Sequence, residues 1–320
     1  MLRALPADAH FHVLTDPAAS VQVRAWLDQY RTGSRVEVHE APGDLEFSLW
    51  IQDPVLFRED GTAVLSPEFD RYDDRDAATM LTGAMDCVQA PSPVHVDGGN
   101  LIVHGDMVLI SANARATDAE LAMLDPARRF VRVGTRLPCR AQQTRETGRP
   151  AKGWSEIVHA LNVDGTRQPI FHLDHFIAPA GHARGRPRFL VGCPRLGAKM
   201  IGRPEWPHAQ AEAFDEIAVC LENQGAEVVR NPQPLVWVDR PERHLRRWFH
   251  LPVNNVLIHG GTVLMPAFDN AHWPELAGVD GANAEIWQAC GLDVQPVPNV
   301  MALAEGMGGP RCMVKVTARR

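Results

Sequence analysis

Five short polar segments of this chain carry side chains that could perform covalent chemistry together. They are Trp-Ile-Gln-Asp at 50–53, Asp-Gly-Gly-Asn at 97–100, His-Leu-Asp at 172–174, Asn-Asn at 254–255 and Gly-Gly-Pro-Arg-Cys at 308–312. They supply one thiol, one imidazole and three carboxylates, on Cys312, His172, Asp53, Asp97 and Asp174. This set of groups is sufficient for nucleophilic attack on a cationic carbon.

A β-hairpin pattern follows these segments. After Asp53, two β-like runs at 55–57 and 62–65 flank an Asp-Gly pair, which provides the positive φ angles that a tight hairpin turn needs. The pattern returns at 101–110 and 256–265, in a looser form at 176–192, and as a single run at 313–316. Five separate points of the sequence are therefore expected to aim polar groups at one place.

Helical patterns fill the stretches between the hairpins. Apolar residues recur at spacings of three and four in the segments 18–30, 77–85, 209–224 and 282–290. A short β-like run follows each helix, at 37–38, 86–88, 227–229 and 292–294. The repeating unit is therefore helix, strand, polar loop and hairpin, with a period of roughly fifty to eighty residues. Such units, stacked around an axis, would bury one core and bring the polar loops to one end of it.

Composition favours one soluble, enzyme-sized domain over residues 1–320. The chain has 320 residues, of which 45% are hydrophobic, and no low-complexity linker divides it. This length is large for one compact core unless the fold is a closed repeat or barrel. No run approaches the roughly 20 apolar residues of a membrane helix, and the first eight residues do not resemble a signal peptide. We therefore expect a cytoplasmic location and no membrane partner.

Charge and cysteine usage narrow the class further. A net charge of −7 argues against a nucleic-acid partner, and the basic stretches 184–188 and 240–247 are interpreted as solvated faces or as residues at a substrate entrance. The six cysteines show no Cys-x-x-Cys spacing, so most are expected to be reduced core residues.

Taken in order, these motifs resemble the signature of the guanidino-group-modifying pentein enzymes, which include arginine, agmatine and peptidylarginine deiminases and amidinotransferases. Trp-Ile-Gln-Asp, His-Leu-Asp-His-Phe and the later Phe-Leu-Val-Gly-Cys-Pro-Arg are most similar to the peptidylarginine deiminase catalytic domain, and 254–268 resembles a stretch of agmatine deiminases. The resemblance covers about residues 45–318. It implies an α/β fold, a five-bladed α/β propeller with pseudo-fivefold symmetry, in agreement with the repeat count.

Two positions depart from the family pattern. The residue before the catalytic cysteine is often His in these families and is Arg311 here, while the acidic residue before the Gly-Gly pair, commonly Glu, is Asp97. Neither change removes a reacting group. A permanent cation beside the thiol would favour the thiolate but would also repel a cationic substrate, so the departures bear on substrate identity.

The resemblance and the residue chemistry together assign roles. A guanidinium is planar and stays charged near neutrality, so Asp53 and Asp174 would each grip one edge of it with paired acceptors. Cys312 would attack the central carbon, because a thiolate is the strongest side-chain nucleophile. His172 would give a proton to the departing ammonia and then activate water, yielding a ureido product. Asp97 would orient His172 or share the guanidinium, and Trp50 would pack on the substrate or in the core.

This mechanism needs no metal and no cofactor. Its expected partner is a small-molecule or peptidyl guanidino substrate, and the chain could form a homo-oligomer. Transfer of the amidino group to an amine instead of water is the main alternative. If free arginine is the substrate, its carboxylate needs a cationic partner, for which the candidates are Arg184, Arg186, Arg188, Arg195 and Arg311.

Other functions were weighed against this one. The N-terminal Asp-Ala-His-Phe-His at 8–12 resembles the His-x-His strand of metal-dependent amidohydrolases, with His10 and His12 as metal ligands, but that fold needs eight strand–helix pairs. His10 and His12 could equally form a solvent-facing stripe. A propeller that only binds ligands is disfavoured because the thiol and imidazole are both present. Asn254 and Asn255 are expected to be structural, capping a loop before a strand.

Overall fold

The chain divides into two compact units. The computed structural model describes residues 9–30, 35–66, 72–95, 97–140, 142–144, 153–159, 165–203, 210–269 and 272–317. The first unit comprises Met1–Gly98, Arg115–Pro126 and Cys312–Arg320, and the second comprises Gly99–Ala114 and Ala127–Arg311. Both units contain helices and strands, so the predicted α/β class is confirmed. A single domain over residues 1–320 stays a prediction.

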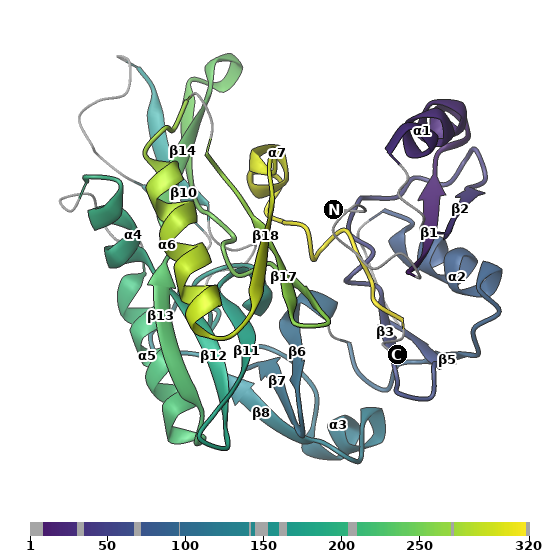
Figure 1. The fold of residues 1–320 in the computed structure, drawn as a ribbon, viewed down its shortest axis with the longest axis horizontal. Coiled ribbons are helices and arrows are strands. Elements are labelled where there is room, and N and C mark those ends of the chain that lie inside the picture. Colours follow the sequence, from purple (N-terminus) through teal and green to yellow (C-terminus); the bar gives the residue numbers. More distant parts are fainter. Residues whose placement is uncertain are drawn as a thin grey trace. The chain divides into compact units, whose positions relative to one another are not determined.

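A parallel strand pair opens the first unit. β1 (His10–Thr15) and β2 (Arg35–Glu40) pair in register from His10 with Arg35 to Thr15 with Glu40. α1 (Pro17–Tyr30) comes between them in the sequence and packs against both strands (Figure 1). Helix and strand lie where the spacing of apolar residues predicted them.

The first unit also contains a three-stranded sheet of order β3-β4-β5. β3 (Val55–Phe57) and β4 (Ala63–Leu65) form the predicted hairpin, and β5 (Gln89–Pro91) adds to β4 in parallel after α2 (Asp74–Ala84). The core beneath α2 is small and made of the buried side chains Val55, Ala63, Leu65 and Ala78.

The second unit repeats this plan three times, each as a hairpin followed by a parallel third strand. The sheets have the orders β6-β7-β8, β11-β12-β13 and β16-β17-β18. Their strands are β6 (Leu101–His104), β7 (Met107–Ser111), β8 (Arg129–Val133), β11 (Ile177–Ala183), β12 (Arg186–Cys193), β13 (Glu227–Pro232), β16 (Leu257–His259), β17 (Thr262–Pro266) and β18 (Asp293–Val297).

The central strand of each sheet is the most apolar because it is covered on both faces. β7, β12 and β17 each contain a run of buried side chains, such as Phe189, Leu190 and Val191 in β12. α5 (Ala211–Asn223) packs against β12 and β13 and presents Phe214, Ile217 and Leu221, at the three- and four-residue spacing of a helix face.

The second unit also contains the helices α6 (Leu276–Ala289), α4 (Pro194–Met200) and α7 (Met301–Glu305). α6 packs against β13, β17 and β18, and its Trp287 is fully buried. α4 packs against β13, and α7 follows β18 in the sequence. α3 (Asp118–Leu124), which belongs to the first unit, begins with a capping box formed by Thr117 and Glu120.

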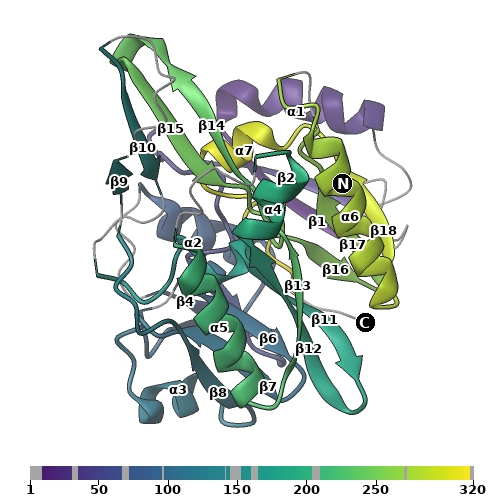
Figure 2. The same cartoon turned by 90° about the vertical axis from the view of Figure 1, so that its left-hand side faces the viewer.

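One sheet of the second unit lies outside the repeat. It has the order β14-β15-β10-β9, with β14 (Leu235–Arg240), β15 (Leu245–His250), β10 (Ser155–His159) and β9 (Gln142–Thr144). β14 and β15 form a long antiparallel ribbon, and β10 pairs with β15 in parallel (Figure 2). This sheet was not predicted from the sequence.

Several sequence expectations are corrected by the structure. The run predicted at 313–316 is not a strand: residue 313 lies in a turn and residues 314–316 have no regular structure. The run predicted at 86–88 gives way to β5 at 89–91. α3 and β8 were not predicted. The start of the helix expected at 209 lies outside the described residues, and a five-bladed propeller stays a prediction.

The alternative based on His10 and His12 required a closed barrel of parallel strands. In the described part of the chain the strands form separate sheets of two to four strands, and β1 pairs with β2 alone. The barrel of an amidohydrolase is therefore not present among these residues. In the same part of the chain, no helix combines the length and the apolar character that crossing a membrane requires.

The cysteines are less uniformly buried than expected. All six lie in the described residues and none forms a disulfide with another of them. Cys139 and Cys312 are buried and the other four are half-buried, and two of these four, Cys87 and Cys290, pack against hydrophobic core clusters. Burial raises the pKa of Cys139 to about 12, which leaves it a poor nucleophile.

Candidate active site

The predicted site residues are divided between the two units. Trp50, Asp53, Asp97 and Cys312 belong to the first unit, and His172 and Asp174 belong to the second. Each unit therefore carries one set of predicted groups. Most of these groups come from loops that lead into short strands, whereas Cys312 lies in a turn that follows α7.

In the first unit, three loops that are far apart in the sequence converge through backbone hydrogen bonds. The amide nitrogen of Gln52 donates to the carbonyl oxygen of Cys312 at 3.2 Å, and the amide nitrogen of Gly98 donates to the carbonyl oxygen of Asp53 at 3.2 Å. The Gln52 side chain adds a hydrogen bond from Nε2 to the carbonyl oxygen of Gly98 at 3.3 Å. The structure thus brings together the segments that hold Asp53, Asp97 and Cys312.

The side chains of this cluster differ in exposure. Asp53 and Cys312 are each 2% exposed, whereas Trp50 and Asp97 are half-buried. Lys315 Nζ donates to the carbonyl oxygen of Gln52 at 3.1 Å, which adds a cation to the cluster. A buried carboxylate and a buried thiol in one small region are suited to holding a cation and attacking it.

Gly98 is the tightest point of this cluster. A Cβ atom at Gly98 would lie 1.9 Å from the carbonyl oxygen of Gln52, so a side chain cannot be accommodated without moving the backbone. The glycine is therefore required by the close approach of two loops rather than by a turn.

In the second unit, the His172 ring is fixed by its neighbours. It stacks on Phe171 with ring centroids 4.0 Å apart, contacts the His175 ring edge-on at 5.5 Å, and is 2% exposed. A Cβ atom at Gly99 would lie 2.4 Å from His172 Nδ1, so the ring occupies the space that a side chain at Gly99 would need. The imidazole is thereby held in one orientation.

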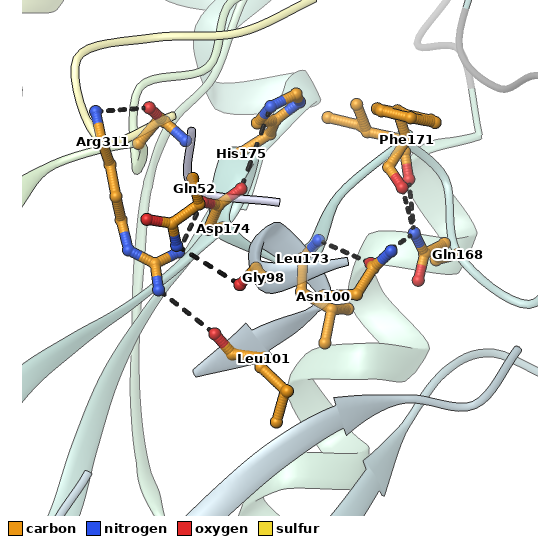
Figure 3. A network of polar contacts seen from close by, with 12 residues as sticks. Gln52, Gly98, Asn100, Leu101, Gln168, Phe171, Leu173, Asp174, His175 and Arg311 are labelled. Atoms are coloured by element: carbon orange, nitrogen blue, oxygen red, sulfur yellow. Dashed lines mark hydrogen bonds and ion pairs between the residues drawn. The ribbon is translucent and has the colours of Figure 1, made fainter. Parts of the chain in front are cut away.

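Asp174 binds a guanidinium that belongs to the protein. Its side chain is 1% exposed, and Arg311 Nη1 forms an ion pair with its Oδ2 (Figure 3). Arg311 Nη2 donates to the carbonyl oxygen of Leu101 at 3.1 Å, and the Arg311 amide donates to Asn255 Oδ1 at 2.9 Å. Arg311 is therefore a part of the site whose role the sequence only hinted at, as a departure from the family pattern.

Amide side chains hold the loop that carries His172 and Asp174. Asn100 Oδ1 accepts hydrogen bonds from the Leu173 backbone at 3.3 Å and from Gln168 Nε2 at 3.1 Å (Figure 3). Asn254 Nδ2 donates to the carbonyl oxygen of Phe176 at 2.8 Å. Asn254 and Asn255 are buried and bond to backbone groups, as expected for structural residues.

His175 is a second buried imidazole beside Asp174. Its Nε2 lies 3.9 Å from Asp174 Oδ1. Burial lowers the pKa of His175 well below its usual value, and the nearby His172 and Arg311 lower it further. His175 is consequently neutral near pH 7, whereas Arg311 faces Asp174 as a cation.

Of the other four arginines considered for substrate recognition, three have carboxylate partners elsewhere in the second unit, and Arg184 is exposed. Arg188 pairs with Glu227 at 2.8 Å, and Arg186 lies 3.6 Å from the same residue. Arg195 pairs with Glu212 and Asp215. These ion pairs are consistent with solvated surface charges, and of these candidates it is Arg311 that contacts a predicted site residue.

A small hollow in the second unit is lined in part by His175, His250, Phe249 and Met307. It measures about 240 Å³ including the solvent at its mouth. Because this volume includes open solvent, the enclosed part of the hollow is smaller still and lies below the roughly 300–1,000 Å³ of usual ligand pockets.

Sequence reasoning missed several residues that shape the site. Lys315 falls in the strand predicted at 313–316, and Asn100 has no predicted role although its side chain organises the loop at 173. Gln168, whose Nε2 donates to Asn100 Oδ1, had no sequence signal at all. These contacts join residues that are 263, 73 and 68 positions apart.

Comparison with known proteins places the fold. No protein-family model matches the sequence, and no curated protein matches it. An agmatine deiminase from C. jejuni with substrate bound superposes with a TM-score of 0.63 at 10% identity, over 98% of this chain and 84% of that one. A structure provisionally described as a peptidyl-arginine deiminase gives 0.61 at 11% identity, over 98% and 86%.

A third similar structure is an amidinotransferase from Microseira wollei in the saxitoxin biosynthetic pathway. Its TM-score is 0.51 at 11% identity, over 94% of this chain and 79% of that one. The chain therefore has the fold of the pentein enzymes, and the predicted resemblance to this group is confirmed at the level of the fold.

Proposed function

We propose that this protein modifies guanidino groups through a covalent intermediate on Cys312, and that it hydrolyses its substrate to a ureido product and ammonia. The observation that carries the proposal is the buried carboxylate of Asp174, which lies next to the predicted base His172 and already binds a guanidinium, that of Arg311. A pocket that holds one guanidinium in this way is chemically suited to another.

The predicted reaction follows from the groups in each unit. Cys312 Sγ would attack the guanidinium carbon, the tetrahedral adduct would lose one nitrogen as ammonia, and a thiouronium would remain on the sulfur. His172 would supply the proton that ammonia takes. Water, deprotonated by the same imidazole, would then add to the thiouronium carbon, and the thiolate would leave as the ureido product forms.

Orientation is the main contribution of the carboxylates. Asp53 and Asp174 are each at most 2% exposed, so their charges act in a region of low dielectric where a cation is held strongly. Fixing the planar guanidinium in front of a nucleophile can lower a barrier by several kcal/mol. Asp97, half-buried in the first unit, is proposed to orient His172 or to share the cation.

Arg311 gives this site an internal competitor for the substrate's guanidinium, which the sequence suggested only as a cation beside the thiol. Because Arg311 and a substrate would carry the same cationic group, both would compete for Asp174. We expect the Arg311 side chain to leave Asp174, or to shift to one of its oxygens, when a substrate binds.

The product also depends on which acceptor, water or an amine, attacks the thiouronium. Amidinotransfer shares the first half of the reaction and differs in that an amine, not water, attacks the thiouronium. The fold is shared with an amidinotransferase as well as with a deiminase. Hydrolysis is preferred here because water needs no additional binding site.

A panel of guanidino compounds tests the proposal. Arginine, agmatine, a blocked peptidyl-arginine and methylated arginines would be incubated with the full-length protein, with and without an amine acceptor, and assayed for ammonia, ureido product and transferred amidino group. Ureido formation that is absent in Cys312→Ala supports the proposal. Transfer only with the amine would replace hydrolysis by amidinotransfer, and a panel without turnover would contradict the function.

A further inference from the structure

A cluster of two histidines and one glutamate lies on the parallel strand pair of the first unit. His12 is in β1, and Glu37 and His39 are in β2. His12 pairs with Glu37 in the strand register, and His39 is two residues further along β2. Because side chains alternate along a strand, all three project from the same face of this sheet.

Their ligand atoms are already close together. His12 Nδ1 lies 3.1 Å from His39 Nε2 and 3.9 Å from Glu37 Oε2, and one ligand atom of each residue lies within 4.8 Å of the other two. The two imidazole rings are almost parallel, with an angle of 10° between their planes. Such mutual approach of three potential ligands is what a bound cation requires.

The distance between the two imidazole nitrogens matches the coordination of zinc. Imidazole nitrogen and carboxylate oxygen bind Zn²⁺ at about 2.0–2.2 Å, so two ligands of a tetrahedral ion are about 3.3 Å apart. The 3.1 Å contact between His12 Nδ1 and His39 Nε2 is a hydrogen bond, and a zinc ion that displaces its proton can contact both nitrogens without a change of strand register. Glu37 Oε2, at 3.9 Å from His12 Nδ1, would approach the ion by rotation of its side chain, which is 33% exposed.

We propose that His12, Glu37 and His39 bind one divalent transition metal ion, with zinc as the best fit. Side-chain exposures of 20% for His12 and 33% for Glu37 leave the site open on one side, where water would complete the coordination. The ion would tie β1 to β2. None of the three residues belongs to the groups assigned to guanidine chemistry, so the site is independent of the proposed function.

The proposed site uses only one histidine of the His-x-His motif at residues 10–12, which is His12. In the register, His10 pairs with Arg35, whereas His12 pairs with the potential ligand Glu37. His10 is exposed and lies outside the cluster. The second histidine of the site therefore comes from the neighbouring strand, and His10→Ala is a matched control on the same face of the same strand.

Zinc titration of the full-length protein tests the site. Chelator-treated wild type, His12→Ala, His39→Ala, Glu37→Gln and His10→Ala would be titrated with ZnCl₂ by isothermal calorimetry, with far-UV circular dichroism as the check on folding. We expect one ion per wild-type chain. Each histidine variant should bind at least a hundredfold more weakly, Glu37→Gln about tenfold more weakly, and His10→Ala as the wild type does.

Two further measurements keep the test decisive. His39→Gln serves if His39→Ala does not fold, because it keeps a polar side chain and loses the imidazole. Cobalt substituted for zinc should give an intense visible absorption in wild type that is absent in the His39 variants. Absence of stoichiometric binding overturns the proposal, as does binding that survives in both His12→Ala and His39→Ala or is lost equally in His10→Ala. Binding lost in Cys312→Ala but kept in His39→Ala would place the ion on the thiol and overturn it too.

Discussion

The two sets of site residues are held in different ways. In the first unit, hydrogen bonds to main-chain carbonyl oxygens join the loops at Gln52, Gly98 and Cys312, and one of their donors is the Gln52 side chain. In the second unit, the ion pair between the Arg311 and Asp174 side chains and the bonds of the Asn100 side chain join the loops. When main-chain hydrogen bonds hold a loop, a side-chain substitution has little effect on the position of the loop. A loop held by a buried ion pair depends on the chemical identity of both partners.

This difference predicts a separation of activity from stability. Substitutions at Asp53 and Cys312 should act mainly on chemistry, whereas substitutions at Asp174 and Arg311 should act on chemistry and folding together. The substitutions that follow challenge this contrast, beginning with the largest expected effect.

Cys312→Ala should abolish turnover, with a loss of at least about ten thousandfold in kcat, because no other group supplies the nucleophile. Thermal unfolding should be nearly unchanged, since the main-chain carbonyl of residue 312 accepts the bond from Gln52. Mass spectrometry of wild type treated with a haloacetamidine should find the adduct on Cys312. Labelling confined to the half-buried Cys87 or Cys290 would show that the nucleophile has been misassigned.

His172→Gln should lower turnover by about a thousandfold, within the range for a lost general acid and base. Substrate binding should persist, and slow thiol attack should leave a thiouronium that has no base to activate water. Intact-protein mass spectrometry with the best guanidine of the panel should therefore detect an accumulating adduct. Undiminished multiple turnover in this variant would assign the proton transfers to another residue.

Asp53→Asn and Asp174→Asn should each lower kcat/KM by about a hundredfold, a loss of roughly 2.7 kcal/mol, because each removes a charge from the cation site. Their stabilities should differ. Asp174→Asn also removes the counter-charge of Arg311, so its urea midpoint should fall clearly below that of Asp53→Asn. Equal losses of stability in the two variants would refute the contrast between the units.

Arg311→Gln should lower KM by about tenfold, since the substrate would no longer compete with an internal guanidinium for Asp174. The same variant should lose about 3 kcal/mol of unfolding free energy, because a buried carboxylate loses its cation. Arg311→Lys is the matched control, which keeps the charge and should lie between wild type and Arg311→Gln in both measurements. A higher KM in Arg311→Gln would instead make Arg311 a substrate-binding residue.

The smallest expected effect is a change in the pH dependence of stability at Asp280, whose carboxylate accepts hydrogen bonds from backbone amides. Burial raises its pKa to about 6, against the hydrogen bonds from the Phe268 and Asp269 amides, which lower it. The folded pKa lies above the unfolded value, so the stability that the protonated form contributes is present below pH 4 and is lost as pH rises through 6. Between pH 5 and pH 8, the free energy of unfolding measured with urea should fall by about 1 kcal/mol more in wild type than in Asp280→Asn. The exposed Asp293→Asn should behave as wild type, and identical pH dependence in Asp280→Asn would contradict the assignment.

Local signals explain what the sequence predicted well. The hairpins at 55–65, 101–110 and 257–265 turn at Gly61, Gly105 and Gly261, whose φ angles of 84°, 61° and 83° are positive, as the glycine-containing turns required. Helix spacing located α1 and α5 to within a few residues. These features depend on neighbours in the chain, which a sequence displays directly.

Long-range contacts explain what it predicted poorly. β10 pairs with β15 although about ninety residues separate their paired positions, such as Ser155 and Leu245. Arg311 meets Asp174 across 137 residues, and no periodicity encodes such a pairing. α3 is a different case, since the Thr-x-x-Glu at 117–120 is a capping-box signature that could have located it.

The adjacent glycines at 98 and 99 restrict which substitutions this loop can accept during evolution. A methyl group at Gly98 would collide with the Gln52 carbonyl, and one at Gly99 with the His172 ring, so the two positions exclude alanine for unrelated reasons. A library that varies this loop would keep both glycines under selection for activity, yet relief of one collision would not relieve the other. A replacement of Gly99 could be compensated by a smaller side chain at residue 172, whereas a replacement of Gly98 needs a movement of the backbone, because every residue at position 52 has a carbonyl oxygen.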